Sequence, residues 1–278
     1  MYQDASVDGK EREIHMNLRE KYGEWGVILG ATEGVGKAFC EKIADGGMNV
    51  VMVGRREQKL NELGESIKEQ YGVDYKVVRA DFSEADAAET VFAATDGLDM
   101  GFMSYVACLH SFGKIQDVPW ETHQAMINVN VITFMKCFYH YMQIFTAQDR
   151  GAVINVSSMT AISSSPWNGQ YGAGKAYNLK MTEAVAAECE NTNVDVLAIT
   201  LGTTLTPSLL SNLPGGPEGE AVMKIAQTPE EVVDEAFDSL GKDLSIICGE
   251  RNKASVHDWK ANHTEDEYIR YMGSFYAD

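Results

Sequence analysis

The segment Val153-Ile-Asn-Val-Ser-Ser158, followed by Tyr171-Gly-Ala-Gly-Lys175, decides the fold. An apolar run that closes in serines predicts a buried strand with polar side chains at its carboxyl end. The residues that follow Tyr171 are rich in Ala, Lys, Met and Glu, which predicts a long helix reaching Glu190. Because Tyr171 and Lys175 are four residues apart, they lie on one helix face, one turn from each other.

A phenol beside an ammonium can exchange a proton with an alcohol or a carbonyl oxygen. The ordinary pKa of a phenol is about 10, and an adjacent ammonium lowers that pKa because it favours the phenolate. Ser158 could donate a hydrogen bond to the same oxygen. An ordinary surface pair is the alternative for Tyr171 and Lys175, and the other motifs of the chain decide against it.

A second motif lies near the start of the chain. The apolar stretch Trp25-Gly-Val-Ile-Leu29 predicts a strand, and helix-forming sequence continues to Ala44. The glycines between them permit a tight turn, allow backbone amides to approach a pyrophosphate and leave a helix amino terminus free for an anion. The spacing differs from the commoner G-x-G-x-x-G. This turn predicts dinucleotide binding by Gly30, Thr32, Gly34, Val35 and Gly36.

The end of the next predicted strand, Asn49–Val53, bears on the choice of cofactor. In a dinucleotide fold an acidic residue there binds the ribose of NAD, whereas arginine accommodates the 2′-phosphate of NADP. Gly54 occupies the usual acidic position, and Arg55 and Arg56 follow it. The sequence therefore favours NADP(H) over NAD(H), although Glu33 in the glycine turn would repel the same phosphate.

Strands and helices alternate along the rest of the chain. Further strands are predicted at 75–79, 100–107, 152–156, 194–201 and 244–248, and helices at 83–95, 119–128, 129–146 and from Thr228. This alternation predicts an α/β fold, a single Rossmann-type doubly wound parallel sheet with helices on both faces. Asp81 and Phe82 close one strand and are expected beside the adenine; capping of the following helix is an equal alternative for Asp81.

Over nearly its whole length the chain resembles the short-chain dehydrogenase/reductase family. Four separated elements match in order: the glycine turn, Asn130, Ser158 placed thirteen residues before Tyr171, and Tyr171-x-x-x-Lys175. The resemblance implies that Tyr171 is the general acid and base and that Ser158 orients the substrate oxygen. It also implies that Lys175 lowers the pKa of Tyr171 and holds the nicotinamide ribose.

Two further roles and three departures come with the resemblance. Asn130 would kink its helix and hold a water in a proton relay to Lys175, and Thr206 would bind the cofactor carboxamide. The segment Tyr105-Val-Ala-Cys108 stands where the family usually has Asn-Asn-Ala-Gly, Leu29 replaces a common Thr, and Leu201 replaces the usual Pro. None of these departures removes a catalytic group.

Within the family, the segments 30–37 and 53–60 look most like the hydroxysteroid dehydrogenases. The resemblance implies an NADP-dependent oxidoreductase that interconverts a secondary alcohol and a ketone, with a small apolar, steroid-like or bile-acid-like substrate. A ketoacyl-type ketoreductase is the first alternative. The second is a non-catalytic cofactor-binding regulator, which only the altered segment 105–108 supports. His110 and Trp167 are expected either to line the substrate site or to be ordinary loop residues.

Residues 1–22 are expected to form an amino-terminal extension with a short charged helix, and residues 23–278 a dinucleotide-binding oxidoreductase domain. Proline, glycine and leucine at about 203–227 suit either a lid over an apolar substrate or a plain surface crossover. The predicted 129–146 helix is apolar nearly all round, and aromatic residues occur in the tail (Trp259, Tyr268, Tyr271, Phe275, Tyr276). Both features suit a homodimer or homotetramer.

Composition excludes several classes of protein. The formal charge of −18 and the isoelectric point of about 4.7 argue against nucleic acid and anionic membrane surfaces as partners. Five cysteines without a C-x-x-C motif predict neither disulfides nor zinc, and no His/Asp/Glu cluster has the spacing of metal ligands. The absence of a signal peptide and of a long apolar run favours the cytoplasm.

Overall fold

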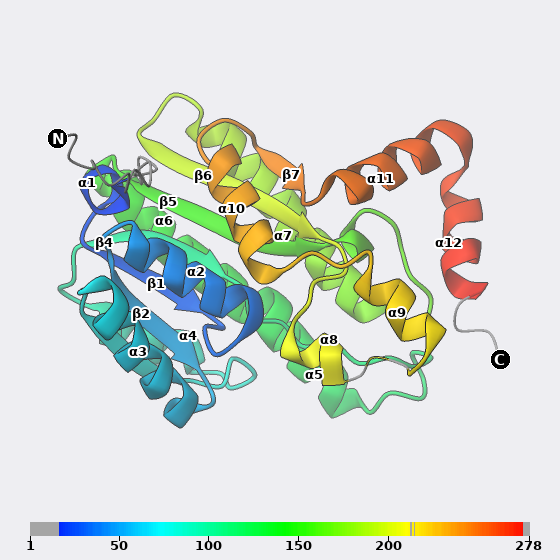
Figure 1. Cartoon of the computed structure of the whole chain (residues 1–278), viewed down its shortest axis with the longest axis horizontal. Helices are drawn as coiled ribbons and strands as arrows, with labels where there is room; N and C mark the ends of the chain where they lie inside the picture. The colour runs from blue at the N-terminus through cyan, green and yellow to red at the C-terminus, as the bar shows by residue number, and fades with distance from the viewer. Residues whose placement is uncertain (1–16, 212, 214, 275–278) are drawn as a thin grey trace, which may run out of the picture.

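The computed structural model describes residues 17–211, 213 and 215–274. In this part of the chain seven strands form one sheet, in the order β3-β2-β1-β4-β5-β6-β7, and every neighbouring pair is parallel (Figure 1). The predicted α/β fold is therefore confirmed. The strands are β1 (Trp25–Leu29), β2 (Asn49–Gly54), β3 (Tyr75–Arg79), β4 (Met100–Tyr105), β5 (Gly151–Ser158), β6 (Val194–Leu201) and β7 (Ser245–Ile247).

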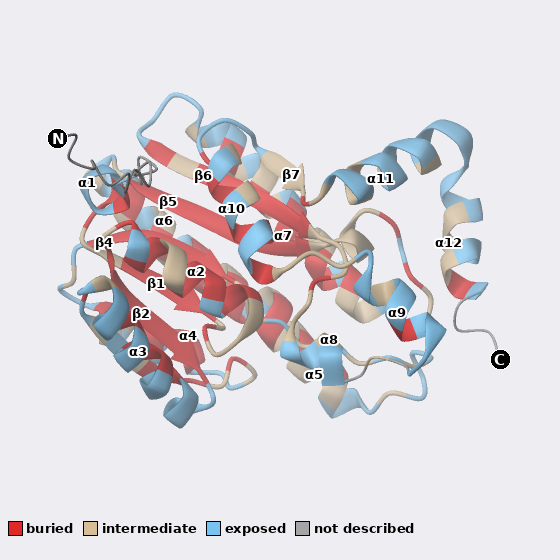
Figure 2. Ribbon diagram, viewed as in Figure 1, coloured by how far each residue is buried: buried red, intermediate tan, exposed pale blue. Residues whose placement is uncertain are grey.

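Helices cover both faces of the sheet, and each layer has its own apolar core. On one face α2 (Gly34–Asp45), α3 (Glu57–Tyr71) and α10 (Pro229–Ser239) bury their apolar side chains. On the other face α4 (Ala87–Thr95), α6 (Phe134–Gln148) and α7 (Gly169–Cys189) do so. Figure 2 shows the buried sheet between these two half-exposed layers. The strand order reverses between β1 and β4, so a crevice opens there at the carboxyl ends of the strands.

A π-helix joins two helices that the sequence predicts as separate elements. α5 (Trp120–Ile127) continues through a π-helix at Asn128–Thr133 into α6. π-Helices are rare and are frequently found at functional sites, and this one contains Asn130. The structure thus has a wider helical turn at Asn130, where the family resemblance implies a kink.

Two predicted boundaries are wrong for local reasons. β4 ends at Tyr105 and not at residue 107, because the amides of Val106 and Ala107 both turn to the carbonyl of Leu29, at 2.9 and 2.8 Å. α4 begins at Ala87 and not at residue 83, because the residues after Asp81 form turns. The other predicted strands and helices agree with the structure to within a few residues.

The predicted lid segment contains two short helices, α8 (Pro207–Ser211) and α9 (Pro217–Met223). Beyond β7, α11 (Glu250–Asn262) and α12 (Glu265–Ser274) project past the edge of the sheet (Figure 1). In the tail, the ring of Trp259 packs on Tyr268 and Tyr271 of the same chain, with centroids 4.9 and 5.0 Å apart. Phe275 and Tyr276 lie outside the described residues.

The first described helix, α1 (Leu18–Tyr22), packs against β4 and β5. Leu18 and Tyr22 are buried in the core, and the Tyr22 hydroxyl donates to a carboxylate oxygen of Asp195 at 2.7 Å. Most of the charged helix predicted within residues 1–22 lies outside the described residues. None of the described helices has both the length and the hydropathy of a membrane-spanning segment.

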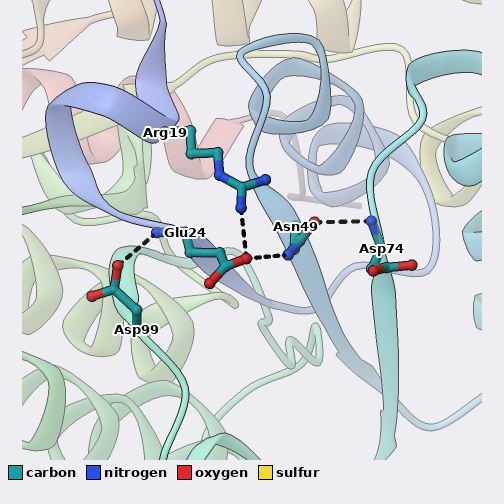
Figure 3. A network of polar contacts seen from close by, with 5 residues as sticks. All are labelled: Arg19, Glu24, Asn49, Asp74 and Asp99. Carbon is teal, nitrogen blue, oxygen red and sulfur yellow. Dashed lines mark hydrogen bonds and ion pairs between the residues drawn. The ribbon is translucent and has the colours of Figure 1, made fainter.

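A polar network fastens the amino ends of four strands, opposite the crevice (Figure 3). The Glu24 carboxylate accepts from Arg19 at 2.6 Å and from the Asn49 amide at 3.4 Å. The Glu24 backbone amide donates to Asp99 at 3.1 Å, and the Asn49 side-chain oxygen accepts from the backbone amide of Asp74 at 2.9 Å. These contacts link residues at the starts of β1, β2, β3 and β4.

Candidate active site

The carboxyl ends of the central strands surround a cavity of about 430 Å³. Most residues predicted to bind the cofactor or to act in catalysis line it. They are Gly30, Thr32, Val35, Arg55, Arg56, Asp81, Phe82, Ser158, Tyr171, Lys175 and Thr206. Gly34, Gly36 and Asn130 are absent from the lining. The structure thus gathers side chains from six segments of the chain at the predicted edge of the sheet.

The glycine turn is shaped by contacts that leave no room for side chains. Gly30 has φ +102°, and a Cβ there would lie 2.6 Å from the backbone nitrogen of Ala107. A Cβ on Gly36 would lie 2.0 Å from the Gly30 carbonyl oxygen, and one on Gly34 would lie 2.9 Å from Thr206. α2 begins at Gly34 without a side-chain cap, so its first backbone amides are available to an anion.

The proton-transfer pair lies where α7 passes the end of β5. Lys175 is 1% exposed and donates from Nζ to the Val156 carbonyl at 2.8 Å. Its Nζ lies 5.9 Å from the centroid of the Tyr171 ring. The Tyr171 hydroxyl interacts with the side chains of Ser158 and Cys108. Ser158, Tyr171 and Lys175 therefore form one cluster in the cavity.

Burial dominates the protonation of this pair. Burial raises the pKa of the Tyr171 phenol above its ordinary value, Cys108 raises it further, and the hydrogen bond with Ser158 opposes them. Burial also lowers the pKa of the Lys175 ammonium. Burial thus sets the direction of the shift in this structure, and the lowering of the Tyr171 pKa by Lys175 stays a prediction.

Asn130 is buried and fastens the loop after β4. Its side-chain nitrogen donates to the Leu109 carbonyl at 2.7 Å, and its side-chain oxygen accepts from the Leu109 amide at 3.0 Å. The side-chain amide nitrogen of Asn178 donates hydrogen bonds to the backbone carbonyls of Asn130 and Gly174, at 2.7 and 3.1 Å. Asn130 thereby joins the loop to α7. Its role in a water relay stays a prediction.

Charged residues form pairs at the mouth of the cavity. Arg56 contacts Glu33 at 2.9 Å, Lys59 contacts the same carboxylate at 3.5 Å, and Arg55 lies 3.8 Å from Asp81. The hydrogen bond with Arg56 holds the pKa of Glu33 below its ordinary value. The predicted repulsion by Glu33 is therefore countered by two cations in direct contact with it.

Asp81 does not cap the following helix. The residue at the amino cap of α4 is Asp86, whereas a carboxylate oxygen of Asp81 accepts from the Ser83 amide and hydroxyl at 3.0 and 2.8 Å. These two bonds orient the carboxylate at the wall of the cavity. The proposed contact between Asp81 and adenine stays a prediction.

The loop after β4 contributes residues that the sequence does not assign to the catalytic cluster. Cys108 lines the cavity and contacts Tyr171, and the His110 ring lies 5.8 Å from the Tyr171 ring. Two signals in the sequence point to this loop: the departure from the family pattern at residues 105–108, and His110, which is expected either to line the substrate site or to be an ordinary loop residue. Trp167 instead lines a separate cavity of about 540 Å³. Among the described residues, no group of three or more His, Cys, Asp or Glu is arranged to hold a metal ion.

Comparison with known proteins gives close relatives. The family model described as short chain dehydrogenase matches residues 24–213. A 7beta-hydroxysteroid dehydrogenase of Collinsella aerofaciens is 84% identical over 95% of this chain and 100% of its own length. One from Clostridium sardiniense is 44% identical over 90% of this chain and 95% of its own length.

Solved structures agree with these matches. A structure from work on 7beta-hydroxysteroid dehydrogenase stereoselectivity has a TM-score of 0.91 and 84% identity, and the match covers 92% of this chain and 99% of that chain. A Sphingobium yanoikuyae short-chain dehydrogenase in complex with NADPH has a TM-score of 0.74 and 20% identity over 86% of this chain and 92% of that chain, and shares the fold. This chain belongs to the short-chain dehydrogenase family.

Proposed function

We propose that this protein is a hydroxysteroid dehydrogenase that interconverts a 7β-hydroxyl group and a 7-ketone on a bile-acid-like steroid. The observation that carries the proposal is the cluster of Ser158, Tyr171 and Lys175 in one cavity, in a chain 84% identical to a 7beta-hydroxysteroid dehydrogenase. When bound, a nicotinamide cofactor would supply or accept the hydride. The chain positions the substrate and moves the proton.

Each side chain of the cluster has a separate proposed role in the reaction. Tyr171 Oη gives a proton to the ketone oxygen in reduction and takes it back in oxidation. Ser158 and Tyr171 line the same cavity and their side chains interact, so both hydroxyls are proposed to bind one substrate oxygen. The Lys175 ammonium stabilises the phenolate that reduction leaves. Thr206, near the glycine turn, belongs to the proposed lid at 203–227 and is proposed to bind the carboxamide.

A substrate panel tests the function. Steroids with a 7β-hydroxyl, a 7α-hydroxyl or only a 3-hydroxyl, and a ketoacyl thioester, are each assayed with NADP(H) and NAD(H). We expect kcat/KM for the 7β-hydroxysteroid to exceed that for each of the other compounds by at least ~100-fold, since differences in transition-state binding produce discrimination of this size. Turnover of the thioester alone would identify a ketoacyl-type ketoreductase. Tight cofactor binding without turnover of any compound would identify a non-catalytic regulator.

We further propose that the cofactor is NADP(H). At the cavity mouth three cations (Arg55, Arg56, Lys59) stand against two carboxylates (Glu33, Asp81). Among these five paired residues the cations outnumber the carboxylates by one, and arginine after β2 favours the extra phosphate of NADP. Gly54 places no carboxylate there, and a Cβ on it would lie 2.7 Å from the Thr32 hydroxyl.

Replacing Arg55 and Arg56 together by alanine is expected to raise KM for NADPH by about 10²–10⁴-fold, because two charge-assisted hydrogen bonds of ~1.5–3 kcal/mol each to the 2′-phosphate are lost. KM for NADH, which has no such phosphate, should change less than ~2-fold. Steady-state kinetics with both cofactors measures this. Lys37→Ala is the control, since Lys37 pairs with Glu41 at 3.4 Å. An equal loss with NADH would contradict the assignment of these arginines.

We propose that a second copy of the chain covers the groove between α6 and α7, giving a homodimer or homotetramer. The groove has a volume of about 640 Å³, and Met135, Tyr139, Met142 and Met181 are among its lining residues. Tyr139 is 58% exposed. Tyr139→Glu should shift sedimentation velocity toward the monomer, whereas an unchanged profile would exclude this face. A cytoplasmic location stays our proposal, in keeping with five unpaired cysteines among the described residues.

A further inference from the structure

Tyr105 is a buried tyrosine at the end of β4, where the family pattern has asparagine. Its side chain is fully buried, and its hydroxyl donates to the Val129 carbonyl at 2.6 Å. Val129 is the residue before Asn130 and belongs to the π-helix at Asn128–Thr133. A side chain that departs from the family pattern thus holds the backbone directly beside a predicted catalytic residue.

The hydrogen bond matters because of the geometry of the π-helix. In a π-helix the amide bonds reach back five residues, so the turn holds an extra residue and changes register against the α-helices around it. Such a turn persists only where surrounding contacts favour it. The Tyr105 hydroxyl supplies one of these contacts at Val129, and the Asn178 amide supplies another at the Asn130 carbonyl.

The register of this turn determines where Asn130 points. Asn130 fastens both backbone polar groups of Leu109, next to Cys108, which contacts the Tyr171 hydroxyl. On the other side Asn178 links the Asn130 carbonyl to Gly174, the neighbour of Lys175. A slip of the π-helix to α-helix would therefore shift contacts that reach both members of the proton-transfer pair.

We propose that Tyr105 is a positioning residue for catalysis, whose hydroxyl holds the π-helical register that places Asn130 between the loop after β4 and α7. The inference rests on the proposed activity. The ring of Tyr105 packs between Phe82 and Phe134, with centroids 5.8 and 5.4 Å away. Replacing Tyr105 by phenylalanine keeps this ring packing and removes only the hydroxyl, so the variant measures the contribution of the hydroxyl alone.

The test compares Tyr105→Phe with Tyr141→Phe. Tyr141 is also fully buried, and its hydroxyl shares a 3.0 Å hydrogen bond with the Thr95 hydroxyl, away from the cavity. Both variants lose one buried hydrogen bond, so similar shifts in Tm are expected. We expect kcat to fall about 10-fold in Tyr105→Phe, the worth of one such bond, and less than ~2-fold in Tyr141→Phe. KM for NADPH should not change in either variant.

Double variants with Asn130→Ala show whether Tyr105 acts through Asn130. If it does, Tyr105→Phe adds little to the loss in kcat caused by Asn130→Ala. Losses that multiply, an unchanged kcat in Tyr105→Phe, or an equal loss in Tyr141→Phe would each overturn the proposal.

A second readout does not depend on activity. Backbone amide hydrogen exchange at residues 128–133 should accelerate in Tyr105→Phe and stay as in the unmodified protein in Tyr141→Phe. Unchanged exchange in Tyr105→Phe would overturn the inference even if the substrate panel succeeds. Accelerated exchange in a protein that turns over no substrate would refute the proposed function and leave the role of Tyr105 in holding the π-helix intact.

Discussion

Tyr171→Phe is expected to lower kcat for steroid oxidation and reduction by about 10³-fold or more, within the ~10²–10⁴-fold range of general acid–base catalysis. The phenylalanine ring fills the same space but has no proton to transfer. Because Tyr171 lies in the catalytic cluster and not at the charged mouth of the cavity, the dissociation constant for NADPH should change little. Single-turnover kinetics and a fluorescence titration of NADPH measure the two quantities separately.

Tyr177→Phe is the matched control for this variant. Tyr177 is half-buried on the same helix and packs against the ring of Phe134, 6.3 Å away. It should retain nearly full kcat, since its hydroxyl is not in the cavity lining. Activity of Tyr171→Phe near that of the unmodified protein would contradict the proton-transfer role and transfer it to another group in the cavity.

The parts of the site that the sequence predicts correctly depend on local chemistry. The glycine turn follows from backbone geometry, since Gly30 has φ +102°. Ser158 lies at the end of a strand, and Tyr171 and Lys175 lie four residues apart on one face of the helix that packs beside it. Parallel strands place such ends at one edge of the sheet, so the order of motifs along the chain was sufficient to place them in one cavity.

The parts that the sequence does not predict depend on contacts between distant segments. The π-helix is held by hydroxyl and amide groups of Tyr105 and Asn178, and no periodicity within 119–146 shows it. The raised pKa of Tyr171 depends on its burial, which spacing on a helix does not determine. Likewise the pairing of Glu33 with Arg56 and Lys59 depends on where α3 begins relative to the glycine turn.

Lys175→Met is expected to lower kcat/KM for alcohol oxidation at neutral pH by about 10–10³-fold, because a close opposite charge shifts a pKa by ~1–3 units. Methionine keeps the length and the packing of the side chain but removes the charge. Oxidation needs the phenolate of Tyr171 as base. Since burial raises the pKa of Tyr171, the loss of the ammonium leaves less phenolate at any given pH.

The sign of the pH dependence follows from this argument. A higher pKa of Tyr171 means that more base must be added before the phenolate forms, so the rising limb of kcat/KM against pH should move to higher pH in Lys175→Met. Lys180→Met is the control, because Lys180 is exposed on the same helix and pairs with Glu183 at 2.7 Å. It should leave the profile unchanged. A rising limb at the same pH in Lys175→Met would show that another group sets the protonation of Tyr171, and Cys108, which contacts its hydroxyl, would be the first to examine.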